Sequence, residues 1–152
     1  MTEQMQYELA LKIATKAHEG QLDKSGVDYI KHPIAVASFC HTFRAKIVAL
    51  LHDTIEDTYV TKDFLLQQGL DEDIVEAVVL LSKWEGFDET RDSVAYMSAI
   101  KKNPLAREVK LCDLLHNMDP TRTMKDMEWK AQKTRIYYRE FLYLFVDDME
   151  TF

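Results

Sequence analysis

The segment Ala49-Leu50-Leu51-His52-Asp53-Thr54-Ile55-Glu56-Asp57-Thr58 concentrates polar side chains directly after an apolar run. A helix advances about 100° per residue, so a helix through this segment would place His52 and Asp53 side by side. Glu56 and Asp57 would then lie one turn further on. Such a cluster next to a core-forming run is costly unless a cation binds it. The segment therefore predicts a divalent metal site.

The composition predicts one all-α domain spanning residues 1–152. Only four glycines and three prolines are present, 47% of the residues are hydrophobic, and no stretch alternates with the period of a strand. The net charge of −7 argues against a nucleic-acid polymer as partner. No signal pattern or membrane-length apolar run occurs, so we expect a cytoplasmic protein without membrane contact.

Hydrophobic spacing predicts helices whose ends are marked by capping residues, glycine or proline. The predicted helices are 5–19, 32–43, 45–58, 61–68, 71–81, 92–102, 105–117 and 128–149. The last of them carries an aromatic stripe from Ile136 to Phe145, which predicts core packing or a subunit contact and leaves a homodimer open. The two cysteines, Cys40 and Cys112, stand in apolar helical context and are predicted to be buried free thiols.

Two further candidate ligands lie far from the first segment in the sequence. His32 stands where a polar loop meets a predicted helix, and Asp113 lies among leucines and a cysteine. An aspartate in such apolar surroundings is unusual unless it is paired or coordinated. Together with His52 and Asp53 they make a set of two imidazoles and two carboxylates. This set suits Mn²⁺, Fe²⁺ or Zn²⁺ better than Ca²⁺ or Mg²⁺, and the sequence leaves the choice among the three open.

A metal at these residues would make the neighbouring polar groups chemically useful. The ion would lower the pKa of a bound water and polarise a phosphoryl oxygen. Glu56 and Asp57 would hold or deprotonate that water, or protonate a leaving oxygen. Asn117 lies four residues after Asp113 and would face the same site. Candidate phosphate contacts are Lys24, Ser25 and Lys110.

Four ordered blocks carry a resemblance to a known family. They are Ala17-His18-Glu19-Gly20-Gln21, Lys24-Ser25-Gly26 with Tyr29-Ile30-Lys31-His32-Pro33, Leu50-Leu51-His52-Asp53-Thr54-Ile55-Glu56-Asp57-Thr58, and Val109-Lys110-Leu111-Cys112-Asp113-Leu114-Leu115-His116-Asn117-Met118. With these blocks the chain resembles the HD-domain phosphohydrolases. Among the HD-domain phosphohydrolases, the chain is similar to the hydrolase domain of RelA/SpoT-type proteins and to stand-alone small alarmone hydrolases.

The resemblance implies an all-α HD fold and a Mn²⁺ ion held by four ligands, which are His32, His52, Asp53 and Asp113. It implies that Glu56 and Asp57 serve the hydrolytic water. It also implies a guanosine 3′-diphosphate substrate, ppGpp or pppGpp, which is cut to GDP or GTP and pyrophosphate. The positions that match nucleotide contacts of the family are Lys24, Ser25 and Asn117.

The sequence departs from the family at two places near the implied substrate. Asp23 stands where the family usually has an arginine, and Asp119-Pro120 stands where its arginine follows the last ligand block. Two alternatives therefore stay open. The chain could be an HD phosphohydrolase of another phosphorylated metabolite, such as a nucleoside phosphate or NADPH, or it could be a non-catalytic nucleotide sensor.

Overall fold

The computed structural model describes residues 1–122 and 127–147. Over these ranges the chain forms helices and no strand. The helices are α1 (Glu3–Ala17), α2 (Lys31–Phe39), α3 (Phe43–Leu51), α4 (Thr54–Asp57), α5 (Lys62–Gln67), α6 (Glu72–Leu81), α7 (Glu89–Lys102), α8 (Pro104–Asn117) and α9 (Met127–Phe145). The prediction of an all-α fold is confirmed.

Helix α3 is the centre of the fold. Thr42 caps it by accepting a hydrogen bond from the backbone of Ala45, and every residue from Ile47 to Leu51 is fully buried. A helix that is apolar on all sides has to be covered on all sides. Helices α1, α2, α6 and α8 supply that cover.

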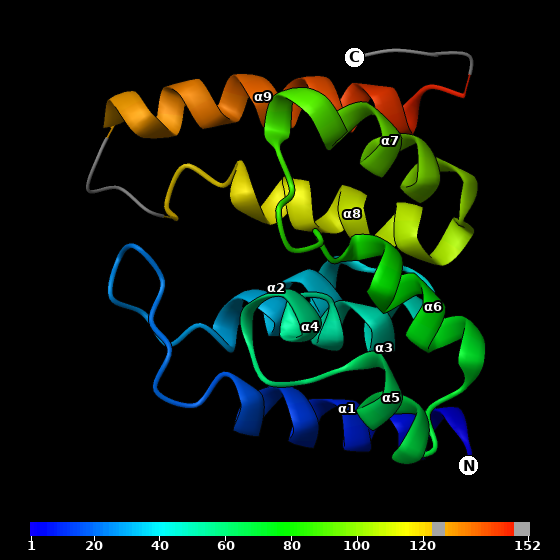
Figure 1. The fold of residues 1–152 in the computed structure, drawn as a ribbon. Coiled ribbons are helices and arrows are strands. Elements are labelled where there is room, and N and C mark those ends of the chain that lie inside the picture. Colours follow the sequence, from blue (N-terminus) through cyan, green and yellow to red (C-terminus); the bar gives the residue numbers. More distant parts are fainter. Residues whose placement is uncertain (123–126, 148–152) are drawn as a thin grey trace.

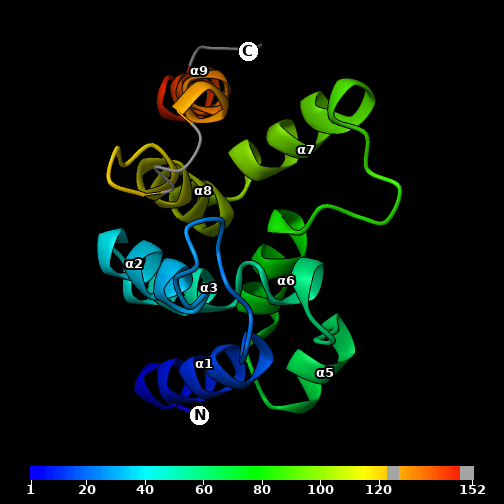
Figure 2. The same ribbon diagram turned by 90° about the vertical axis from the view of Figure 1, so that its left-hand side faces the viewer.

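The helices stack in layers (Figure 1), from α1 through α2 and α3 to α8 and α9. Helices α5, α6 and α7 run along one side of this stack (Figure 2). The segment 20–30, which we call the hairpin, leaves the end of α1 and folds back toward α9 (Figure 1). Within it, Gly26 has a φ of 81°, a conformation that side chains other than glycine rarely adopt.

The predicted helix 32–43 ends earlier than expected. Helix α2 stops at Phe39, and a new helix starts at Phe43. The carboxylate of Glu108 in α8 accepts hydrogen bonds from the backbone nitrogens of His41 at 2.7 Å and Thr42 at 3.0 Å. This corner is therefore fixed to α8 by a partner that hydrophobic spacing cannot reveal.

The predicted continuous helix 45–58 is also wrong, because α3 ends at Leu51 and α4 starts at Thr54. The ring of His52 donates a hydrogen bond from Nδ1 to the carbonyl of Ala49 at 2.6 Å. The hydroxyl of Thr54 donates to the carbonyl of Leu51 at 2.7 Å. These side chains satisfy the last carbonyls of α3 and so end the helix. The single helical face predicted for the polar cluster does not exist.

The remaining differences are smaller. Helix α7 begins at Glu89, earlier than predicted, because Asp88 caps it by accepting from the backbone of Arg91 at 2.8 Å. The last helix ends at Phe145, earlier than the predicted end at Met149, because the described residues Val146 and Asp147 already lie outside it; Met149 itself lies outside the described residues. Both cysteines are free and buried, as predicted.

The aromatic stripe of α9 is divided between core and surface. Tyr143 and Leu144 are buried, whereas Tyr138 and Phe145 are exposed. The core packing is thus confirmed in part, and the subunit contact stays a prediction. Among the helices described, none combines the length and the apolar character needed to cross a membrane.

Candidate metal centre and the hollow around it

The structure brings the four predicted ligands together from three parts of the chain. His32 lies at the start of α2, His52 and Asp53 join α3 to α4, and Asp113 lies in α8. One ligand atom each from the first three residues lies within 4.8 Å of the others. The Oδ1 atom of Asp113 is 2.9 Å from Nε2 of His32 and 3.5 Å from Nε2 of His52. Two imidazoles and two carboxylates therefore converge on one point.

The protonation of His52 shows why this point suits a cation. Its Nδ1 donates to a carbonyl, so in the neutral ring Nε2 presents a lone pair. This buried Nε2 makes no hydrogen bond in the described part of the chain, and it faces the carboxylates of Asp53 at 3.1 Å and Asp113 at 3.5 Å. A lone pair that faces two carboxylates needs a proton or a metal between them. Although burial opposes the charged ring, the two carboxylates raise the pKa of His52 well above its usual value.

A second histidine orients His32. Nδ1 of His32 lies 2.7 Å from Nδ1 of His116, and the two rings stack. If Nε2 of His32 offers its lone pair to the centre, its Nδ1 donates and His116 has to accept. Burial, followed by the neighbouring charges of His32 and Arg122, lowers the pKa of His116 to about 4, which keeps this ring neutral.

Tyr29 of the hairpin holds Asp53. Its hydroxyl donates to Oδ2 of Asp53 at 2.6 Å. Burial, then the negative charge of Asp53, raises the pKa of Tyr29, so the phenol stays protonated and remains a donor. The hairpin thus contributes directly to the orientation of a candidate ligand.

We expect Tyr29→Phe to weaken Mn²⁺ binding about 10- to 100-fold, the usual effect of removing a hydrogen bond to a metal ligand. Isothermal titration of the metal-free protein with Mn²⁺ measures the affinity. Tyr59→Phe is the matched control, since Tyr59 is 63% exposed. Equal Mn²⁺ affinity of Tyr29→Phe and the wild type would contradict this role.

Lys110 forms a buried ion pair with the same centre. Its Nζ lies 3.1 Å from Oδ2 of Asp113, and the two side chains are 14% and 8% exposed. Although burial opposes the charge, Tyr96 and Asp113 raise the pKa of Lys110 well above its usual value. The ammonium group of Lys110 therefore supports Asp113, and the phosphate contact predicted for Lys110 stays a prediction.

Glu56 and Asp57, the predicted catalytic residues, lie on α4 and are exposed in part. Oε1 of Glu56 accepts a hydrogen bond from the backbone of Lys83 at 2.7 Å, which links α4 to the segment between α6 and α7. Partial burial, and then the charge of Asp53, raises the pKa of Asp57 to about 6. Burial also raises the pKa of Glu56. Both carboxyl groups can therefore exchange protons closer to neutrality than an ordinary carboxyl group.

The three predicted substrate residues occupy different surroundings. Lys24 lies with Nζ 3.6 Å from the ring centre of Trp129, a contact that joins the hairpin to α9. The hydroxyl of Ser25 is buried and has no hydrogen-bond partner among the described residues. Asn117 donates to Oδ1 of Asp113 at 3.2 Å and accepts from the guanidinium of Arg122. Asn117 thus belongs to the centre, whereas the other two belong to the hairpin.

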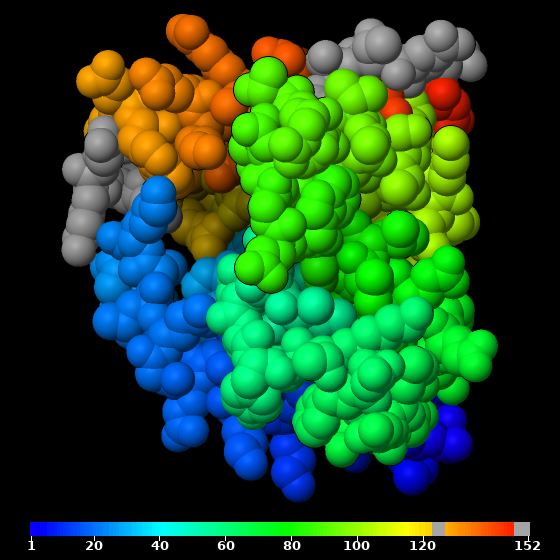
Figure 3. Space-filling model, in the orientation of Figure 1, coloured from blue at the N-terminus to red at the C-terminus, as the bar shows by residue number. Residues whose placement is uncertain are grey.

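Two cavities involve residues described above, one through Ser25 and His32 and the other through Lys83. One of about 200 Å³ adjoins His32 and is lined by residues of the hairpin and of the segment after α8. The other, of about 340 Å³, lies between α7 and α9, and we call it the α7–α9 cavity. Figure 3 shows a hollow between the hairpin, α9 and the green segment that leads into α7.

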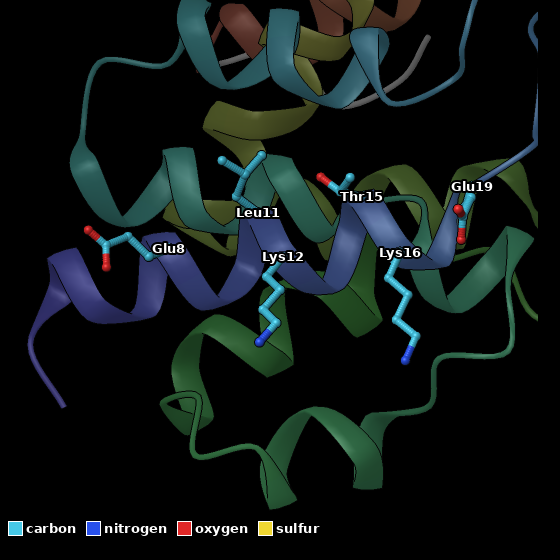
Figure 4. A pocket seen from close by; sticks show the side chains of 6 residues that line it. All are labelled: Glu8, Leu11, Lys12, Thr15, Lys16 and Glu19. Carbon is cyan, nitrogen blue, oxygen red and sulfur yellow. The ribbon is translucent and has the colours of Figure 1, made fainter.

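A further cavity, of about 550 Å³, lies along the surface of α1 (Figure 4). Its lining residues are Glu8, Leu11, Lys12, Thr15, Lys16 and Glu19. Five of the six belong to α1 and Glu19 follows its end, and none is a predicted site residue. The candidate site is therefore the hollow beside the candidate metal ligands.

A family model described as HD domain matches residues 10–147 of the chain. The chain belongs to the HD-domain family. This HD domain is 37% identical over 120 residues to a guanosine-3′,5′-bis(diphosphate) 3′-pyrophosphohydrolase of Borreliella burgdorferi, an alignment that covers 72% of this chain and 18% of the relative. It is 32% identical over 147 residues to the bifunctional (p)ppGpp synthase/hydrolase SpoT of Escherichia coli, covering 90% of this chain and 20% of the relative. The chain spans about a fifth of the length of these relatives.

A solved structure confirms the fold of this HD domain. It is described as a metazoan ortholog of SpoT that hydrolyzes ppGpp, and it matches with a TM-score of 0.76 at 19% identity. The match covers 95% of this chain and 89% of that chain. At this identity the likeness establishes the helical HD arrangement alone.

The structure also identifies supporting residues that the sequence did not single out as functional. Tyr29 and His116 each hydrogen-bond to a candidate ligand. The spacing contained a signal for His116, because it lies three residues after Asp113 and therefore on the same helical face. No spacing rule connects Tyr29 with Asp53, since the hairpin brings them together.

Proposed function

We propose that this chain is a metal-dependent hydrolase that removes the 3′-pyrophosphate from ppGpp or pppGpp and leaves GDP or GTP. The observation that carries the proposal is the convergence of His32, His52, Asp53 and Asp113 on one point, with an orphaned imidazole nitrogen facing two carboxylates. The relatives, which are named for acting on ppGpp or (p)ppGpp, support the choice of substrate. The proposed location is the cytoplasm.

The four converging residues fit a divalent cation by the chemistry of their donor atoms. Two imidazoles and two carboxylates suit Mn²⁺, Fe²⁺ and Zn²⁺, and we propose Mn²⁺. When bound, such a cation lowers the pKa of a water and polarises a phosphoryl oxygen. His116, Tyr29 and Lys110 hold the ligands in place.

We assign the proton transfers to α4. A carboxylate of Glu56 or Asp57 accepts the proton of the attacking water, and the resulting acid returns a proton to the leaving ribose oxygen. The raised pKa values of both groups suit this exchange. Lys24, Ser25 and Asn117 contact the nucleotide in this proposal.

The α7–α9 cavity suits the phosphates of such a substrate. Its lining includes the cations Lys83, Lys133 and Arg139 and the carboxylates Glu89 and Glu140, and Nζ of Lys83 pairs with Oε1 of Glu89 at 2.6 Å. Lys83 also connects this cavity to the proposed catalytic helix, because its backbone donates to Glu56. Lys133 and Arg139 are therefore the candidate phosphate contacts that this cavity offers next to the proposed proton-transfer residues.

Incubation of the purified protein with Mn²⁺ and ppGpp tests the proposal. We expect release of GDP and pyrophosphate, measured by anion-exchange chromatography, and loss of the reaction in excess EDTA. Nucleoside triphosphates and NADPH are incubated with the protein in parallel reactions. Turnover of one of these without turnover of ppGpp would select the alternative substrate. Binding of ppGpp without turnover of any compound would select the non-catalytic sensor.

The pH dependence of kcat/KM should report Asp57 if this carboxylate is the base. The base is active when deprotonated, so kcat/KM falls about tenfold per pH unit below its pKa. The pKa of Asp57, about 6 without a cation, sets the upper limit of this acid limb, because a bound cation lowers the pKa of a nearby carboxyl group. The Asp57→Asn variant should lose this fall of kcat/KM at low pH. The Asp63→Asn variant, altered on the exposed part of α5, should keep it. A rate that falls above pH 6 instead would make Asp57 an acid.

A further inference from the structure

Helix α9 has an exposed apolar face on the side away from the core. It is the outermost helix of the stack, and it packs with its other side on α8 and α7 (Figure 1, Figure 2). Tyr137 and Phe141 belong to the packed side, and Leu144 is fully buried. By contrast, Tyr138 is 57% exposed and Phe145 is 65% exposed. Two large aromatic side chains on the exposed side of one helix indicate an interaction surface.

The outward side chains of α9 have the spacing of a helix that pairs with another helix. Successive members are four, three, four and three residues apart, and they are Ala131, Arg135, Tyr138, Leu142 and Phe145. This heptad spacing places them on one narrow strip along about four turns, which we call the α9 seam. Leu142 is half-buried and the other members are exposed. Such a seam packs lengthwise against a second helix.

The α9 seam is complementary to itself when a second copy lies antiparallel to it. A two-fold axis near residue 140 sets Tyr138 of each copy against Leu142 of the other copy. The same pairing sets Arg135 against Phe145 of the other copy. The alkyl part of an arginine can cover an aromatic ring while its guanidinium lies over the face of the ring. Each outward side chain from Arg135 to Phe145 thus has a suitable partner.

The charges at the two ends of the α9 seam favour the antiparallel arrangement. Arg135 is exposed and, unlike Arg107, forms no ion pair within the described part of the chain. Asp147 is 85% exposed and follows Phe145 by two residues, about 3 Å along a helix. Its Oδ1 accepts from Arg107 at 2.8 Å, so its Oδ2 can accept from Arg135 of the other copy. A parallel pair would instead bring the two Arg135 side chains together.

We propose that the α9 seam is the interface of a homodimer in which the α9 helices of two copies lie antiparallel. The proposal does not depend on the proposed reaction. It has a consequence for the α7–α9 cavity, because Lys133, Tyr137 and Glu140 line that cavity from the opposite side of the same helix. Pairing of the seams would therefore fix the helix that forms one wall of each cavity.

Sedimentation equilibrium of the full chain over a range of concentrations tests this proposal. We expect a monomer–dimer equilibrium with a Kd of about 10 µM or below, because interfaces of ordinary size begin at micromolar affinity. Tyr138→Glu would bury a carboxylate against Leu142 twice in each dimer, and it should raise the Kd about 100-fold or more. Tyr59→Glu changes a similarly exposed tyrosine between α4 and α5, and this matched control should leave the Kd unchanged.

Arg135→Glu provides an independent variant at an exposed charged position, where the substitution should leave the melting temperature unchanged. It sets a carboxylate against Asp147 of the other copy, so the Kd should rise about 10-fold or more. Lys12→Glu makes the same charge change on the exposed part of α1 and should keep the wild-type Kd.

Three results would overturn the proposal. The first is a wild type that stays monomeric at about 1 mM, a concentration at which even weak specific pairs associate. The second is a dimer whose Kd neither Tyr138→Glu nor Arg135→Glu changes, since the interface would then lie elsewhere. The third is a Kd that rises in Tyr138→Glu but not in Arg135→Glu, which would contradict the antiparallel arrangement.

Discussion

Lys110→Met is expected to lower the free energy of unfolding of the metal-free protein by about 3–5 kcal/mol, the usual cost of leaving one partner of a buried ion pair alone. The ammonium of Lys110 lies 3.1 Å from Oδ2 of Asp113, and both side chains are largely buried. Methionine fills a similar volume but leaves the carboxylate without its nearest full positive charge. Urea denaturation in EDTA measures the loss.

Mn²⁺ should restore much of this stability, because a cation at the ligands replaces the missing ammonium. Saturation at about 100 times the Kd adds about 2.7 kcal/mol to any protein that binds the ion only when folded. The gain should be larger in Lys110→Met than in the wild type if the ion also replaces the positive charge that Lys110 places beside Asp113. Lys102→Met, at the exposed end of α7, is the control and should change stability little. A loss under 1 kcal/mol, with equal gains from Mn²⁺, would show that Lys110 does not support the centre.

Glu56→Gln is expected to lower kcat about 10²- to 10⁴-fold, the range for loss of a general acid or base. The substitution is nearly isosteric, and the amide oxygen of glutamine can still accept the hydrogen bond from the backbone of Lys83. Glu56 is not one of the proposed ligands. Mn²⁺ affinity and the Kd for ppGpp should therefore stay close to those of the wild type.

Single-turnover kinetics at saturating ppGpp measure this effect apart from binding and product release. Glu85→Gln removes the same charge from the neighbouring exposed loop and should keep the wild-type rate. If Glu56→Gln retained full kcat, the assignment of proton transfer to Glu56 would fail, and Asp57 alone would carry it. If the variant also lost Mn²⁺, Glu56 would act as a ligand.

The helical class followed from composition and hydrophobic spacing, whereas the set of four converging residues combined residue type with the resemblance of the four ordered blocks. The prediction from sequence failed at the junction of α3 and α4, where the structure breaks the helix. Hydrophobic spacing runs unchanged through this junction, and the break depends on His52 and Thr54 bonding to carbonyls of the preceding turn. Spacing detects which face of a helix is apolar, but it does not detect side chains that compete for the backbone.

The supporting residues were harder to predict for a different reason. Tyr29 reaches Asp53 only because the hairpin folds back over the ligands. Lys110 resembles a phosphate contact in the sequence, and its burial against Asp113 becomes visible only in three dimensions. The family match covers these positions. The family match does not show which side-chain atoms lie in contact.

The proposed ligands also have a consequence for the lifetime of the protein. More than half of the chain separates His32 from Asp113 in the sequence, so the unfolded polypeptide does not hold them near each other. Metal binding free energy at such a site adds directly to folding free energy. In a cell that is short of the ion, more of the molecules would therefore be metal-free. These molecules would unfold more often and be degraded sooner. Scarcity would lower the abundance of this protein as well as its activity.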